Sequence, residues 1–462
     1  MIQGVRYHPL LAFLLLAGSQ PDPVTAFRDV TVIPMDTERV VEHQTVLVRG
    51  DRIAALGPTG SIAIPADANV VEGSGKFLMP GLVDMHVHLP GDTSAATTRN
   101  ALTLFVSNGV TRVRVLNGNA RHLRVRDSVA RGDLLGPRMY VVGAATGALP
   151  DNTADMRRLL SPQEVARFTE GMKRAGFDFI QVNATLMKSE YDELVNTARK
   201  TGIRLSGSVP NDVGLARVTR AKQASIENLE GYLEPLERDD SPIRLADPVT
   251  RARRLLDYYD EAKLGKLTAS LRSAGIANTP MLFITHVGAT QQAPESLAAW
   301  PEMKYMPPRT VAAWIRGLRR TQEQAPEADR VARFLAFRNR VTKALSDGKA
   351  LVLVGSDANQ TFVVPGYGTL YEIHSLTVAG LTRYEAIRAA TANAAEFMGA
   401  ANEFGTIAPG RVADLVLLDG NPLDDIGNLT LRAGVMLPGT WRPADTRGAA
   451  LRRIAESYQA QP

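Results

Sequence analysis

The most informative part of the sequence for the fold is Pro80–His88, which reads PGLVDMHVH. Its apolar run Leu82–Val87 predicts a buried strand, and because residues two apart on a strand face the same side, His86 and His88 point together. In a barrel of parallel strands, the carboxyl ends form the mouth where active sites lie. Two imidazoles placed in this way can reach one metal ion, because neutral imidazole is the commonest metal ligand. Alternatively, they are polar residues satisfied at a strand end.

On both sides of this stretch, apolar runs alternate with amphipathic helical patterns, which is typical of parallel βα units. Eight such runs predict an α/β fold with a closed (β/α)8, TIM-like barrel. The charged stretches Glu234–Lys266 and Gln291–Lys343 are longer than ordinary connections, and we expect helical insertions that cover the mouth, form an oligomer contact, or do both. The eight runs are Leu82–Val87, Val110–Val115, Met139–Val142, Phe177–Val182, Ile203–Ser206, Ser225–Glu227, Ile276–Leu282 and Leu351–Val354.

Two capping patterns mark helix starts. Ser161–Glu164 places Pro in the first turn, and Thr382 with Glu385 repeats the spacing of a capping box. The second pattern predicts a helix that ends near Gly399.

Both ends of the chain carry short β-type patterns. They lie within Phe27–Leu78 and at Asp414–Asp419, and neither could close a core alone. We therefore expect them to combine into one small β-sandwich domain. The expected division is a signal peptide at 1–26, the first β-sandwich segment at 27–79, the barrel at 80–400, the second β-sandwich segment at 401–445 and a C-terminal tail at 446–462.

The first residues resemble an export signal. Arg6 and His8 precede the apolar run Pro9–Ala17, and small residues and the breakers Gln20–Pro23 follow it. The run is shorter than the roughly 20 apolar residues that a membrane-spanning helix needs. We expect a periplasmic or secreted protein after signal removal; the alternative is a disordered or incorrectly assigned start.

Composition excludes several classes of function. The chain has 462 residues, of which 45% are hydrophobic and 22% charged, as in ordinary globular proteins. Lys and Arg number 53 against 48 Asp and Glu, and this mild, scattered excess is not a nucleic-acid footprint. Cys is absent, so any metal must be held by His and oxygen ligands.

Several motifs resemble those of one enzyme family. From about Val30 to Asn428 the chain resembles the amidohydrolase superfamily, closest to its imidazolonepropionase-like and prolidase-like branch. The resemblance implies the barrel, a β-sandwich from both chain ends, a metal site at the strand ends, and hydrolysis of amide or related C–N bonds. The matching stretches are Asp51–Gly57, the HxH strand, Gly109–Thr111 with Arg114, Gly136–Arg138, Gly355–Ala358 and Gly405–Val416.

The resemblance also assigns a catalytic residue. In this family, a divalent metal activates water, and an Asp at the end of strand eight takes the proton of the water and returns it to the leaving nitrogen. Here that residue is Asp357, which the apolar run Leu351–Val354 places at the end of a buried strand. Asp357 as a helix cap is the alternative.

Three expected ligands are replaced. Gln181 stands where the branch has a carboxylated Lys, and Ser208 and Asn228 stand where it has metal-binding His residues. These uncharged groups are weak ligands or substrate contacts at best. Arg114 either braces the barrel or meets a substrate carboxylate.

Charge then limits the metal content. Two divalent ions bring four positive charges, and Asp357 alone would oppose them. A two-metal site is therefore not expected. One divalent metal can be held by His86, His88 and Asp357, and zinc is the first expectation, with Fe or Mn as alternatives.

Further polar residues could line the mouth. They are Asn183, Glu227, His286, Glu372 and His374. For the two histidines, a surface or capping role is favoured over metal binding, because loop positions lack the constraint of a strand end.

Two functions remain open. The first is a metal-dependent hydrolase of C–N bonds, acting on a small molecule of the dipeptide, N-acyl amino acid or cyclic amide class. The second is a non-catalytic relative that retains the barrel as a binding or scaffold protein. Fold cannot decide between them, because function belongs to the site.

Overall fold

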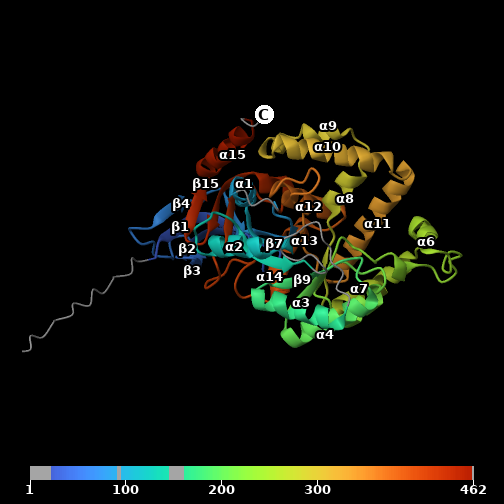
Figure 1. Cartoon of the computed structure of the whole chain (residues 1–462). Helices are drawn as coiled ribbons and strands as arrows, with labels where there is room; N and C mark the ends of the chain where they lie inside the picture. Colours follow the sequence, from blue (N-terminus) through green and yellow to red (C-terminus); the bar gives the residue numbers. More distant parts are fainter. Residues whose placement is uncertain (1–21, 91–94, 145–160, 460–462) are drawn as a thin grey trace, which may run out of the picture.

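The structure is a computed structural model that describes residues 22–90, 95–144 and 161–459 (Figure 1). The export signal expected at the start of the chain lies outside these residues as far as position 21. No helix in the described part of the chain is long and apolar enough to cross a membrane.

Seven parallel strands form the barrel, and each is hydrogen-bonded to the next in chain order. This arrangement confirms the TIM-like α/β fold that the alternating pattern predicts. The strands are β6 (Leu82–Val87), β7 (Val110–Gly118), β8 (Arg138–Gly143), β9 (Phe179–Val182), β10 (Arg204–Gly207), β11 (Ser225–Glu227) and β12 (Ala277–Thr279).

The eighth run, Leu351–Val354, closes the barrel without forming a regular strand. Leu353 donates its amide to the carbonyl of Asn278 on β12 (2.8 Å), and Met85 on β6 donates to the carbonyl of Val354 (2.8 Å). The prediction of a regular strand at Leu351–Val354 is therefore wrong, although the run does close the barrel. One reason is that pairing is irregular just beyond the run, since the amide of Ser356, two residues after Val354, binds the Asp84 carboxylate (3.0 Å) instead of a backbone carbonyl.

The seventh run is also shorter than expected. Ile276–Leu282 reads as a strand, yet β12 ends at Thr279 and a helix begins at Leu282. Pro280 has no amide to donate, and Met281 has a φ of 55° in the left-handed region. The chain therefore turns out of the barrel there.

The helices follow the barrel and its insertions. In Figure 1, α3 and α4 lie side by side along the barrel wall. The α-helices are α1 (Ala95–Ser107), α2 (Ala120–Ala130), α3 (Pro162–Ala175), α4 (Lys188–Thr201), α5 (Leu215–Ala221), α6 (Pro248–Arg254), α7 (Leu264–Ala274), α8 (Leu282–Ala289), α9 (Pro294–Ala298), α10 (Pro308–Glu323), α11 (Ala328–Asp347), α12 (Tyr367–Val378), α13 (Arg383–Ala389), α14 (Ala392–Met398) and α15 (Ala444–Gln459), and the 3-10 turns are η1 (Glu234–Leu236), η2 (Leu255–Asp257), η3 (Glu261–Lys263), η4 (Pro301–Tyr305) and η5 (Ile426–Thr430).

Both capping patterns mark real helix starts. The Ser161 hydroxyl accepts from the amide of Glu164 at the start of α3 (3.3 Å), and Thr382 and Glu385 form a full capping box on α13. The helix expected to run on to Gly399 is instead two helices, α13 and α14. The break leaves the carbonyl of Ala390 free to accept from the amide of Val83 on β6 (2.8 Å).

Strands from both chain ends combine in a second sheet, as expected. The sheet has eight strands in the order β15-β14-β13-β5-β1-β2-β3, with β4 beside β1. Antiparallel pairing of β5 with β13 joins the N-terminal strands to the C-terminal ones. The strands are β1 (Val24–Val32), β2 (Val41–Arg49), β3 (Arg52–Pro58), β4 (Asn69–Glu72), β5 (Phe77–Pro80), β13 (Leu415–Leu418), β14 (Arg432–Leu437) and β15 (Thr440–Pro443).

Regular structure extends across two of the expected boundaries. The sheet begins at Val24, before the boundary at 27, because Val24 and Ala26 already bury their side chains against Leu47. The expected tail at 446–462 is largely the helix α15. Ile454 and Tyr458, which lie four residues apart and so on one face, are both buried.

The insertion at Gln291–Lys343 packs against the segment that follows the eighth run. It forms α9, η4, α10 and most of α11, and its apolar residues share a cluster with Phe362 and Val364, which follow the eighth run. The other insertion, Glu234–Lys266, carries α6, which lies at the edge of the molecule in Figure 1, away from α9 and α10. There Leu245 is 98% exposed.

Candidate metal centre

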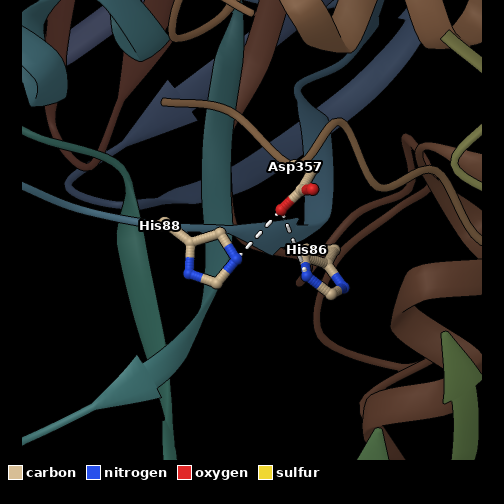
Figure 2. A group of neighbouring side chains, drawn as sticks. All are labelled: His86, His88 and Asp357. Carbon is tan, nitrogen blue, oxygen red and sulfur yellow. Dashed lines mark ion pairs between the residues drawn. The ribbon is translucent and has the colours of Figure 1, made fainter. Parts of the chain in front are cut away.

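Three side chains meet at the mouth of the barrel. His86 lies near the end of β6, His88 follows that strand, and Asp357 follows the eighth run. Oδ1 of Asp357 lies 2.9 Å from Nε2 of His88 and 3.5 Å from Nε2 of His86 (Figure 2). One ligand atom from each residue lies within 4.8 Å of the others, and this is the one group of the kind in the described part of the chain.

Backbone hydrogen bonds fix this meeting. The amide of Asp357 donates to the carbonyl of His86 (2.8 Å), and the amide of His88 donates to the carbonyl of Ala358 (2.7 Å). Asp357 has a φ of 59°, in the left-handed region that Asp tolerates better than most residues. The turn therefore brings its carboxylate back toward the histidines.

Gly355 allows the two segments to approach so closely. A Cβ at this position would lie 2.7 Å from Cβ of His86 and 2.4 Å from Cγ2 of Thr279. Neither atom is the far end of a flexible side chain, so a larger residue would displace His86 or the eighth run.

A buried carboxylate orients His86. Nδ1 of His86 lies 3.0 Å from Oε2 of Glu227, whose Oε1 accepts from Arg114 (2.7 Å) and Ser225 (2.6 Å). Nδ1 is thereby engaged and Nε2 is left to face Asp357. A carboxylate behind a metal-binding imidazole is the usual device for fixing its tautomer and raising its basicity.

Charge in this cluster is balanced without solvent. Burial by itself would raise the pKa of Glu227, but Arg114 and His86 lower that pKa to about 2. Burial opposes protonation of His86, yet the hydrogen bond to Glu227 and the charges of Asp357 and Glu227 outweigh it and raise the pKa of His86. The cluster therefore holds an ionised Glu227 beside a basic imidazole.

Asp84 has a structural role beside the site. Its side chain is fully buried and accepts from the amides of His86 (3.2 Å) and Ser356 (3.0 Å) and from the Thr369 hydroxyl (2.6 Å). It thereby ties β6 to the eighth run directly below the candidate ligands.

The three replaced ligand positions are held by other protein groups. The side-chain oxygen of Gln181 accepts from the amide of Asn117 (2.8 Å), and the Ser208 side chain is hydrogen-bonded to Glu230. The side-chain oxygen of Asn228 accepts from Arg338 on α11 (2.8 Å).

Arg114 is a bracing residue. Its side chain is fully buried and also donates to the carbonyl of Met85 (2.5 Å) and to Ser225 (2.9 Å). Burial with these partners favours the expected bracing role of Arg114 over contact with a substrate carboxylate.

The remaining polar candidates are dispersed. Glu372 is fully buried on α12, where it accepts from the amides of Leu282 (3.0 Å) and Phe283 (2.7 Å) at the start of α8. His374 is exposed on α12, and His286 is half-buried on α8.

His122 is a buried histidine that the sequence patterns above do not single out. It lies near the start of α2, where Nδ1 accepts from the amide of Asn119 (3.1 Å), while Nε2 has no hydrogen-bond partner among the described residues. Burial and the charges of His88 and Arg121 lower its pKa to about 4. The spacing of Asn119 and His122 is that of a cap and its third helical residue, a signal that could have located it.

The donor set fits a divalent ion. Two imidazole nitrogens and one carboxylate oxygen form a two-His, one-carboxylate set, which suits zinc with an open position and also suits Fe(II). One donor atom from each of the three residues lies within 4.8 Å of the others, which is close enough for one ion to contact all three.

Comparisons with known proteins agree on one family. The family model described as "Amidohydrolase family" matches residues 77–442. An adenine deaminase of Rubrobacter xylanophilus is 23% identical over 424 residues, which is 88% of this chain and 56% of that protein. A dihydroorotase of Geotalea daltonii is 26% identical over 231 residues, or 46% of this chain and 53% of that protein. The chain thus spans about half the length of these curated relatives.

Solved structures share the fold. A bottromycin amidohydrolase has a TM-score of 0.73 and 24% identity, with 94% of this chain and 90% of that chain covered. A molinate hydrolase has a TM-score of 0.67 and 18% identity, with 96% and 98% covered. At these identities the likeness is one of fold alone.

Proposed function

The chain belongs to the amidohydrolase family, and from that premise we propose that it hydrolyses an amide-class C–N bond of a small molecule, using one divalent ion held by His86, His88 and Asp357. The single observation that carries the proposal is the convergence of these three side chains at the mouth. They come from opposite ends of the barrel sequence. Backbone hydrogen bonds between the two segments hold them together, and the Glu227 carboxylate orients His86.

Each residue of the site has a separate role in the proposed reaction. A divalent ion at this site supplies the Lewis acidity that makes water nucleophilic near neutral pH and polarises the scissile carbonyl. The side chains of Asp357 and His88 are 18% and 17% exposed, against 8% for His86, so a substrate approaches from the side of Asp357 and His88. Asp357 accepts the proton of the attacking water at its carboxylate and returns it to the leaving nitrogen. Glu227 holds His86 in orientation.

The test joins metal analysis to a substrate screen. We expect the purified protein to take up about one equivalent of zinc, iron or manganese after chelation and reloading, and to hydrolyse members of a dipeptide and N-acyl amino acid library. His86→Ala should lose the ion, and Asp357→Asn should lose about 10²–10⁴-fold in rate. His374→Ala, at an exposed histidine, is the matched control. Hydrolysis that survives both site changes would refute this assignment.

One observation favours a second function. Three positions where the branch has metal ligands carry uncharged side chains here, and each is already hydrogen-bonded to another protein group. They are Gln181, Ser208 and Asn228. This favours a non-catalytic relative that retains the barrel for binding. The same experiment separates the two, because a scaffold would take up no stoichiometric ion and hydrolyse nothing.

A further inference from the structure

A cavity of about 150 Å³ is lined in part by residues that closely follow two of the candidate ligands in the chain. Pro90 and Asn359 line it, and they lie two residues after His88 and Asp357. Two residues span at most about 7 Å of chain. Both residues also follow the carboxyl ends of their barrel segments, so this part of the cavity wall lies on the mouth side, within about 7 Å of chain from His88 and Asp357.

Its wall is apolar and comes from three distant segments. Ala101 and Leu104 come from α1, Tyr305 and Met306 from η4 and the start of the α10 insertion, and Tyr458 from α15. All five are buried, and Leu104, Met306 and both tyrosines belong to one hydrophobic cluster. The barrel, the insertion and the last helix together therefore form the wall of the cavity.

The cavity opens to the surface at a polar rim. Thr310, which is half-buried, and Arg309, which is exposed, lie on this rim at the start of α10. An apolar interior with a polar entrance is the usual form of a small-molecule pocket. A purely structural void would be enclosed on all sides.

Volume then limits the occupant. An apolar protein cavity of about 150 Å³ holds a benzene molecule. We propose that this cavity binds an apolar substituent of the substrate, either a single aromatic ring or a branched aliphatic chain of similar size. The proposal rests on the hydrolase function above for the rest of the substrate. Among compounds of the amide class, the cavity selects those that carry such a group beside the scissile bond.

The test measures binding rather than turnover. N-Acetyl derivatives of L-alanine, L-leucine, L-phenylalanine and L-2-naphthylalanine are titrated by calorimetry into the metal-reloaded full-length protein. We expect the leucine and phenylalanine derivatives to bind about 10-fold or more tighter than the alanine derivative, because each buried CH₂ contributes about 0.8 kcal/mol. We expect the naphthyl group to be too large.

Two variants should shift this preference in opposite directions. Ala101→Leu fills the cavity, so it should abolish the preference for phenylalanine over alanine. Tyr458→Ala enlarges it, so it should admit the naphthyl derivative. Thr310→Phe fills the cavity from the rim and replaces Ala101→Leu if that variant does not fold. Thr103→Leu, on the same helix but beside a different cavity, is the matched control.

The outcomes separate the two proposals. The cavity assignment is overturned if the wild-type protein binds none of the series, or binds it without preference for the ring. It is also overturned if Ala101→Leu or Thr310→Phe leaves the ring preference intact. A ring preference that responds to these variants, in a protein that hydrolyses no amide, supports the cavity and refutes the hydrolase.

Discussion

At the scale of single residues, the site depends on Glu227 as much as on its ligands. Its carboxylate bridges His86 and the fully buried Arg114, so it sets the imidazole tautomer and neutralises a guanidinium that has no access to water. Such supporting carboxylates typically change metal affinity by 10–100-fold.

Glu227→Gln should therefore weaken metal binding by about 10–100-fold and destabilise the fold by about 3 kcal/mol, because a buried charge loses its partner. Chelator competition measures the first effect and urea unfolding of the metal-free protein the second. The matched control is Glu230→Gln, on the same turn, whose carboxylate binds Ser208. Equal metal affinities in Glu227→Gln and wild type would contradict the role given to Glu227.

Individual site residues differ in how well the sequence predicts them. His86, His88 and Asp357 are visible because strand period and barrel geometry place strand-end residues together. Glu227 could be placed near the mouth, but not behind His86, because that contact joins residues 141 positions apart. Gln181 could be recognised as a poor ligand, while its actual partner, the amide of Asn117, depends on a turn conformation.

At the scale of elements, apolar runs predict where barrel segments lie but not how regular they are. The eighth run closes the ring through a few backbone bonds, since the Asp84 side chain takes the amide of Ser356. The division into α13 and α14 likewise follows from carbonyls that barrel residues need. These are long-range hydrogen bonds, and no local pattern encodes them.

The close crossing of the eighth run over β6 gives the second prediction. Gly355→Ala should cost about 1–3 kcal/mol of unfolding free energy, because the new Cβ overlaps His86 and Thr279. It should also weaken metal binding by moving His86. Gly288→Ala on α8 is the control, since a Cβ there meets nothing within 4 Å and Ala favours helix. Urea unfolding measures the free energy of unfolding of both variants. Equal values for the two would contradict this prediction.

At the scale of the whole molecule, the stability of the protein should depend on pH through His122. In the folded protein, burial together with the charges of His88 and Arg121 lowers its pKa to about 4, while an unfolded chain has a pKa near 6.5. Between these values the unfolded state binds the extra proton. This contribution to stability therefore falls as pH drops from about 6.5 to 4.

His122→Gln should reduce that loss. Gln suits the third helical position of a capping box, so it removes the titration while keeping a partner for Asn119. Between pH 7 and pH 5, the metal-free variant should lose about 2 kcal/mol less stability than the wild type. Urea midpoints at the two pH values measure the difference. Parallel losses in the two proteins would exclude His122 as the titrating group.

The way the ring closes has one further consequence. The donors for the ion sit on the first and the last segments of the barrel, about 270 positions apart, and backbone bonds between those segments hold them in place. A half-assembled chain that lacks this seam has no ion-binding pocket at all. If the proposed ion binds, its uptake during refolding should therefore follow ring closure, and the bound ion would stabilise the contact between the two segments only after that contact has formed.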